Sequence, residues 1–147
     1  MLTQENTGLI VIDIQGKLAR LVHDSESLIS NCAKLIKGAT ALNLPIIALE
    51  QNPEKLGTTT YELKQLLGGN SPITKFTFDA GETPEFIEAI KAVKVDTWLV
   101  CGIEAHICVY QTVMHLQQLG LKVELVTDCI ASRTLANKNL AINKLTN

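Results

Sequence analysis

The sequence predicts an α/β fold in which a mostly parallel, doubly wound sheet forms the middle of three α-β-α layers. Two observations predict it. Short apolar runs rich in β-branched residues alternate along the chain with segments of helical periodicity, which is typical of βαβ units. The chain also has 147 residues with 46% hydrophobic and 19% charged residues, which suits one globular domain over residues 1–147.

Five segments are predicted to be strands. The first is apolar at nearly every position from Gly8 to Ile14, the form of a strand buried on both faces of a parallel sheet. The second and third begin at Pro45 and Pro72. The five expected strands span residues 8–14, 45–49, 72–76, 97–101 and 122–127.

Five further segments have the apolar spacing of amphipathic helices. Asp24 or Ser25 is a candidate cap for the first, and Thr59 with Glu62 fits a capping box for the second. Pro84 stands at the first position of the third, where proline is favoured. The expected helices span residues 24–43, 59–67, 83–93, 107–119 and 135–145.

Composition excludes several classes of function. The net charge is −2 and aromatic residues make up 4%, with no basic stripe, so no nucleic-acid partner is expected. The apolar runs are too short to cross a membrane, and residues 1–5 lack the features of a signal peptide. A cytoplasmic protein is therefore expected, with no disulfides. Three of the four cysteines, Cys32, Cys101 and Cys129, lie in apolar stretches and are interpreted as structural.

The fourth cysteine, Cys108, is the candidate nucleophile. It follows a buried strand and a glycine-bearing turn, in the first turn of a predicted helix. Unpaired N–H groups and the positive end of the helix dipole favour thiolate at such a position. Asp13, Glu50, Lys75 and this turn all follow strands, and ligands of open α/β sheets bind beyond the carboxyl ends of the strands.

Asp13 and Lys75 each allow two interpretations. Asp13 follows an apolar strand, where a buried carboxylate needs a partner; it is either a structural cap or a general base. Lys75 is either a solvent-exposed lysine at the end of a strand or a cation that pairs with Asp13 and Cys108. In the catalytic interpretation Asp13 takes the thiol proton and Lys75 holds the thiolate. Backbone N–H groups then form an oxyanion hole, and water hydrolyses a thioester.

Three blocks occur in order along nearly the whole chain: Val11–Gln15, Ile73–Phe78, and Cys101–Val109 followed by Gln111 and Thr112. Together they resemble the isochorismatase-like cysteine hydrolases. The resemblance implies a Rossmann-like sheet of six parallel strands and a catalytic triad of Asp13, Lys75 and Cys108. It also implies a non-proline cis peptide between Ile103 and Glu104 that shapes an oxyanion hole, with Ala105 and Cys108.

The resemblance also bears on metal and cofactor. Nicotinamidases of this family carry an aspartate and histidines after the second strand, whereas this chain has Glu50–Glu54 there, as in a metal-free subgroup. His23, His106 and His115 are scattered without ligand spacing, so neither a metal nor a cofactor is expected. His106 is expected to pack at the turn or to line the pocket rim. The substrate-pocket candidates are Gln15, Glu50, Gln51, Phe78, Asp79 and His106.

Two departures from the family pattern stand out. Asp79, Ala80 and Gly81 replace a small residue and an aromatic that often follow the lysine segment. The sequence ends at Asn147, where the family continues through a sixth strand and a last helix, so these two elements are expected to be missing. A bare sheet edge needs cover, and a homo-oligomer, dimer or larger, would provide it.

The function predicted is a metal-independent cysteine hydrolase of a small amide or related acyl compound. Isochorismate is a less suitable substrate, because cleavage of its vinyl ether depends on an acid more than on a thiol. One alternative is an inactive family member that acts as an interaction protein. Another, a nucleotide or flavin binder, lacks the expected motifs: no G-x-G-x-x-G or P-loop pattern occurs.

Overall fold

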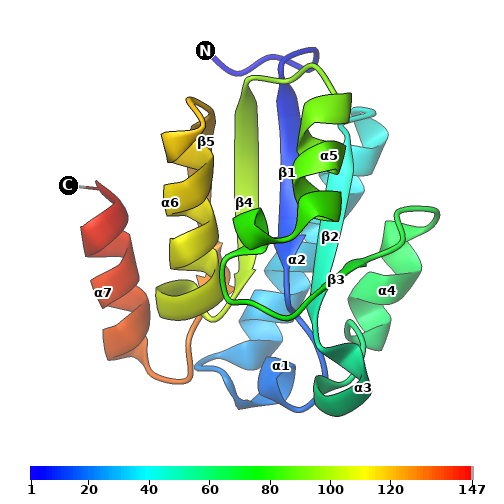
Figure 1. Cartoon of the computed structure of the whole chain (residues 1–147). Coiled ribbons are helices and arrows are strands. Elements are labelled where there is room, and N and C mark those ends of the chain that lie inside the picture. Colours follow the sequence, from blue (N-terminus) through cyan, green and yellow to red (C-terminus); the bar gives the residue numbers. More distant parts are fainter. Residues whose placement is uncertain (147) are drawn as a thin grey trace.

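A parallel sheet of five strands, in the order β3-β2-β1-β4-β5, runs through the centre of the computed structural model, which describes residues 1–146 (Figure 1). Every neighbouring pair of strands is parallel. This confirms the predicted α/β class. The strands are β1 (Thr7–Ile12), β2 (Ile46–Gln51), β3 (Ile73–Lys75), β4 (Thr97–Ile103) and β5 (Lys122–Ala131).

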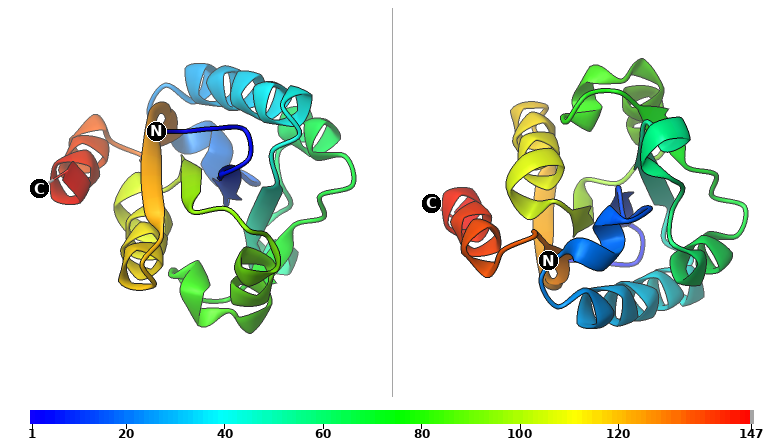
Figure 2. Two further views of the ribbon diagram at one scale, coloured as in Figure 1. Left: turned by 90° about the horizontal axis from the view of Figure 1, so that it is seen from above. Right: turned by 90° about the horizontal axis from the view of Figure 1, so that it is seen from below.

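Helices cover both faces of the sheet, giving three layers (Figure 2). One layer holds α1 (Leu18–Leu21), α2 (Ser25–Ala41) and α4 (Tyr61–Leu67). The other holds α5 (Pro84–Ala92), α6 (Tyr110–Gln118) and α7 (Leu135–Thr146). Shorter turns connect them: α3 (Pro53–Leu56), the 3₁₀ turn η1 (Ala80–Glu82) and the π-helical turn η2 (Ala105–Val109).

Strand β1 shows why the sheet lies at the centre. All six of its residues are buried, and successive side chains point to opposite faces. Leu9 and Val11 belong to the core under α2, whereas Ile10 and Ile12 belong to the core under α6. Each such side chain contributes about 1.5–3 kcal/mol through burial, so the strand stabilises both layers at once.

The elements differ from the sequence prediction in a few places. Strand β5 extends to Ala131 after a register shift opposite Val100 and Gly102, beyond the expected end at residue 127. The predicted capping box is wrong: Thr60 is the N-cap of α4 and makes no side-chain cap bond. The Thr59 hydroxyl donates to Glu50 at 2.8 Å instead. Within residues 1–146 the sheet has five strands, not six.

Two further observations concern the whole described chain. All four cysteines are buried and free. Among the helices of residues 1–146, none combines the length and the apolar character that crossing a bilayer requires.

Candidate active site

The strand order brings the three candidate catalytic residues to one edge of the sheet. Asp13 directly follows β1, Lys75 is the last residue of β3, and Cys108 lies in η2, which follows β4. These strands are parallel and close in the sheet, so their carboxyl ends meet. Asp13 and Cys108 line a cavity of about 580 Å³ there.

Lys75 is a fully buried cation held in place by several oxygen atoms. Its Nζ lies 2.8 Å from Oδ2 of Asp13, and the side chains of the two residues are 0% and 4% exposed. The same Nζ donates to Oε1 of Gln51 at 2.5 Å and to the carbonyl oxygens of Thr77 at 2.9 Å and Phe78 at 3.2 Å. Three neutral acceptors therefore hold the ammonium of Lys75 beside the carboxylate of Asp13.

The carboxylate oxygens of Asp13 are able to accept further hydrogen bonds. Among the described residues, neither of its carboxylate oxygens receives a well-aligned hydrogen bond. Burial raises the pKa of Asp13, while the Lys75 ammonium and the Cys108 thiol lower it to a smaller extent. The residue has φ of 53°, a left-handed conformation that aspartate and asparagine tolerate better than most residues. Asp13 is thus a buried carboxylate able to accept a proton.

The surroundings of Cys108 disfavour thiolate, whereas the helix start in the sequence predicted that thiolate is favoured. Burial raises its pKa from an ordinary value of 9.0 to about 12, the negative charge of Asp13 adds to the rise, and Lys75 opposes it. The turn around it also differs from a regular helix start. The N–H groups of Ile107 and Val109 both donate to the Glu104 carbonyl, at 3.1 and 3.3 Å, so they are not free to face the sulfur.

The turn that carries Cys108 is tightly built. The peptide bond between Ile103 and Glu104 is cis, as predicted from the resemblance. Gly102 has φ of 138°, and a Cβ there would overlap the backbone carbonyl of Ile12 on β1. The Glu104 carboxylate accepts from the backbone N–H of Arg133 at 3.0 Å. Strand β1, strand β4 and the segment after β5 therefore fix the position of this turn.

Three predicted pocket residues lie in the cavity wall, Gln15, Gln51 and Phe78, and so do Ile103 and Glu104 of the predicted cis-peptide turn. The Gln15 amide is fully engaged in holding the wall together. It donates to the carbonyl oxygens of Gln51 at 2.8 Å and Gly57 at 2.6 Å, and it accepts from the Gln51 N–H at 2.6 Å. Gln15 shapes the cavity by joining the two loops that enclose it.

Three other predicted pocket residues, Glu50, Asp79 and His106, do not line the cavity. Glu50 accepts from the backbone N–H and hydroxyl of Thr59, and its neighbour Gln51 faces the cavity instead because side chains alternate along a strand. Asp79 caps η1 through the Gly81 N–H. His106 lies in the turn η2 and is bonded to the Ser132 hydroxyl at 2.8 Å, which agrees with the expectation that it packs at the turn.

Sequence reasoning missed a large part of the wall, which comes from the loops after β1 and β2 and from η2. Leu18, Leu56 and Ile107 contribute apolar surface, and Lys17 and Lys55 contribute charge. No local pattern marks these residues, since they belong to turns too short to show periodicity. The remaining missed residues are Gly16, Glu54 and Gly57.

One group in the described chain has the side chains of a metal site. Asp79, Glu82 and His115 place their ligand atoms within 4.8 Å of one another, outside the cavity wall. No sequence pattern predicts this group, because His115 comes from α6 and the two carboxylates come from the segment around η1.

Comparison with known proteins places the chain in a family. Residues 7–147 match the family model described as Isochorismatase domain, so the protein belongs to the isochorismatase family. This family includes hydrolases. Isochorismatase domain-containing protein 2 of Danio rerio is 30% identical over 145 residues, which cover 98% of this chain and 72% of the relative.

Two solved structures show the same fold. The MAR1 ribonuclease of Caenorhabditis elegans has a TM-score of 0.91 and 34% identity, with 99% of this chain and 74% of that one covered. The YcaC gene product of Escherichia coli, described as an octameric hydrolase of unknown specificity, has a TM-score of 0.93 and 22% identity, with 99% and 73% covered.

Proposed function

We propose that this protein is a cysteine hydrolase that cleaves a small amide or related acyl compound, with Cys108 as nucleophile, Asp13 as general base and Lys75 as the stabilising cation. The observation that carries the proposal is that a thiol and a carboxylate line one cavity and that a buried ammonium is paired with the carboxylate. Family membership supports hydrolysis as the class of reaction.

Acylation begins with Cys108 protonated and Asp13 charged. As the sulfur attacks the carbonyl carbon of the substrate, the thiol proton moves to the Asp13 carboxylate. Burial raises the pKa of Asp13, which makes it a stronger base for this transfer. The positive charge of Lys75 opposes the high pKa of the thiol. The amine then leaves with the proton from Asp13, and a thioester remains on Cys108.

Deacylation uses the same groups in reverse. Asp13 takes a proton from water as the water oxygen attacks the thioester carbonyl, and the sulfur leaves and regains a proton. The sum is one amide and one water converted to one carboxylic acid and one amine. In both steps the developing oxyanion lies near the turn from Ile103 to Cys108. The first N–H groups of a helical turn have no acceptor within the helix, so they can donate to the oxyanion.

The cavity indicates the class of substrate. Its volume of about 580 Å³ is within the usual range for a small-molecule site. Five apolar side chains contribute to the wall, and these favour a substrate with an apolar acyl portion: Leu18, Leu56, Phe78, Ile103 and Ile107. Lys17, Glu54 and Lys55 add charges of both signs to the same wall.

The test is turnover of a panel of small amides and acyl esters, with intact-protein mass spectrometry to trap the acyl-enzyme. We expect an adduct on Cys108 and loss of turnover in Cys108→Ala. Cys129→Ala, which removes a buried cysteine outside the cavity, is the matched control and should keep activity. Absence of any adduct or turnover across a broad panel would favour the alternative, an inactive family member that acts through interactions.

RNA belongs in the same panel, because the similar C. elegans protein is described as a ribonuclease. We expect no cleavage of RNA by this chain, since its net charge is −2 and charges of both signs line the cavity. Degradation that disappears in Cys108→Ala would replace the amide proposal by a ribonuclease function.

We also propose that the protein is a homo-oligomer. Strand β5 has one neighbour, β4, and so forms an edge of the sheet, which proteins usually cover. The octameric state described for YcaC supports the same idea. Light scattering coupled to size-exclusion chromatography tests it, and a monomer at micromolar concentration would contradict it.

A further inference from the structure

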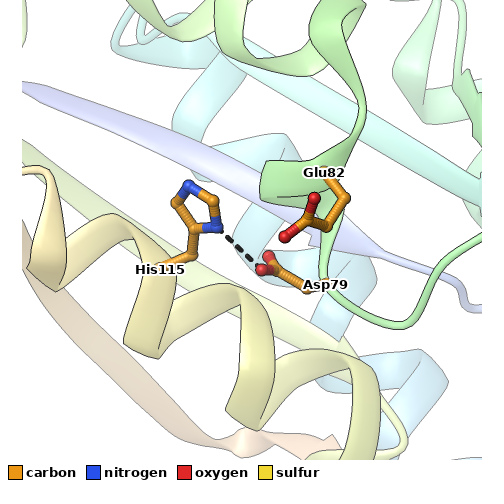
Figure 3. A group of neighbouring side chains, drawn as sticks. All are labelled: Asp79, Glu82 and His115. Atoms are coloured by element: carbon orange, nitrogen blue, oxygen red, sulfur yellow. Dashed lines mark hydrogen bonds and ion pairs between the residues drawn. The ribbon is translucent and has the colours of Figure 1, made fainter.

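A group of three ionisable side chains lies outside the catalytic cavity and has no part in the reaction proposed above. We call it the Asp79–Glu82–His115 cluster. Figure 3 shows the two carboxylates and the imidazole directed toward one another, with His115 coming from α6 and the carboxylates from the segment around η1. Nδ1 of His115 lies 2.7 Å from Oδ2 of Asp79, and one ligand atom from each residue lies within 4.8 Å of the others.

The surrounding chain holds this cluster in position. The other oxygen of Asp79 accepts from the Gly81 N–H at 2.7 Å. Gly81 also makes room for the histidine, because a Cβ at this position would overlap the His115 ring. The Ala80 N–H donates to the Thr112 hydroxyl of α6 at 3.0 Å, which fixes the turn against the helix that carries His115. The backbone of η1 and the ring of His115 are therefore already close together without a ligand.

The carboxylates of the cluster, Asp79 and Glu82, have no lysine or arginine partner in the described chain. The side chains of His115 and Asp79 are 25% and 17% exposed, and Glu82 is exposed. A cation from solvent can reach the cluster, and water can complete its coordination.

We propose that the cluster binds a divalent transition-metal ion, with Zn²⁺ as the best fit, through Nδ1 of His115, Oδ2 of Asp79 and a carboxylate oxygen of Glu82. Imidazole favours Zn²⁺ over Mg²⁺ and Ca²⁺, and zinc also accepts carboxylate oxygens. Ligand bonds of about 2.0–2.2 Å span the observed separation of Nδ1 and Oδ2 without a large movement of either side chain. His115 then carries its proton on Nε2, and its hydrogen bond to Asp79 is replaced by two bonds to the metal.

Metal binding at this cluster has a structural consequence near the cavity. Asp79 follows Thr77 and Phe78, whose carbonyl oxygens accept from Lys75. An ion bound to Asp79 and to His115 would tie this segment to α6. The site is separate from the proposed hydrolase chemistry, and its test does not depend on activity.

The test is calorimetric titration of the full-length protein with Zn²⁺ after treatment with a chelator, in a Cys108→Ala background that removes the cavity thiol. We expect one equivalent to bind. His115→Gln and Glu82→Gln should each weaken binding by at least about 10-fold, since even residues that only orient ligands cost about 10–100-fold. Glu88→Gln, an exposed carboxylate change on α5, is the matched control and should leave binding unchanged.

Absence of Zn²⁺ binding, or binding that His115→Gln and Glu82→Gln do not weaken, would overturn the proposal. A second measurement with Co²⁺ identifies the ligand atoms. Visible absorption of a nitrogen- and oxygen-bound ion is expected, and it should be lost in His115→Gln. A thiolate-to-cobalt charge-transfer band would instead assign the ion to one of the remaining cysteines, Cys32, Cys101 or Cys129.

Discussion

Replacing Asp13 by asparagine should make the Cys108 thiol more reactive while abolishing turnover. Asparagine has nearly the shape of aspartate and tolerates the φ of 53° found at this position. Burial is the largest cause of the raised pKa of Cys108 and stays in place. The change removes the negative charge of Asp13, which adds to the rise, and leaves Lys75, whose charge lowers the pKa. Asp13, the proposed general base, is thus also the residue whose charge opposes formation of the thiolate.

The size of the effect follows from the charges involved. Two unit charges about 4 Å apart interact by about 4 kcal/mol at an effective dielectric constant of about 20, which equals about 3 pKa units. Reorganisation around Asp13 and Lys75 reduces this, so we expect the pKa of Cys108 to fall by about 1–3 units from about 12. A lower thiol pKa increases the fraction of thiolate but makes each thiolate less nucleophilic. The net effect is that the rate of thiol–disulfide exchange rises about 3–4-fold for each unit by which the pKa falls. A shift of about 2 units therefore accelerates exchange about 10-fold.

The assay is the rate of reaction with an aromatic disulfide at about pH 8, with mass spectrometry to locate the label. Loss of Asp13 leaves a buried ammonium unpaired, which costs about 3–5 kcal/mol, so general loosening of the fold must be distinguished. Cys129, buried and outside the cavity, is the internal control. Loosening would label both cysteines faster, whereas the electrostatic effect is confined to Cys108.

A double variant separates the effects further. Adding Lys75→Met to Asp13→Asn removes the remaining positive charge, so labelling of Cys108 should slow again relative to the single variant. Unchanged or slower labelling of Cys108 in a folded Asp13→Asn protein would refute the assignment of Asp13 as the residue that faces the thiol. Folding is checked by circular dichroism and thermal unfolding.

Three other predictions concern stability. Because folding raises the pKa of Cys108 from 9.0 to about 12, the unfolded chain loses this proton first, and the free energy of unfolding should fall above pH 9.0 by up to about 1.4 kcal/mol per pH unit; urea titrations of Cys108→Ser should lack this part of the slope. Gly102→Ala should destabilise the protein by about 3 kcal/mol or more, because its Cβ would overlap the Ile12 carbonyl, and an unchanged urea midpoint would contradict this. Arg20→Ala should cost less than about 1 kcal/mol in the same titration, since its ion pair with Glu62 is solvent-exposed.

The features that sequence predicts well are those set by periodicity and topology. The apolar run of β1 could only be a strand buried on both faces, and parallel pairing then brings Asp13, Lys75 and Cys108 to the same edge. Neither inference needs the position of any particular side chain. Both depend on patterns several residues long, which local sequence shows directly.

The orientation of single side chains could not be predicted in the same way. Glu50 and Gln51 are adjacent on β2, and which of them faces the cavity depends on the face that the loops cover. Asp79 meets His115 only because η1 packs against α6, 36 residues along the chain. The protonation state of Cys108 likewise depends on burial by several elements, and this outweighs the local helix terminus on which the sequence argument relied.

The arrangement of Asp13 and Lys75 is better explained by chemistry than by stability. A buried ion pair is often no more stabilising than apolar residues of similar volume, and here the carboxylate even lacks well-aligned donors among the described residues. The core of β1 already supplies apolar burial on both faces. In the proposed mechanism, the raised pKa of Cys108 would keep the nucleophile protonated until a substrate fills the cavity and the proton moves to Asp13. This would favour selectivity, because a protonated thiol resists reaction with electrophiles that do not fit the cavity.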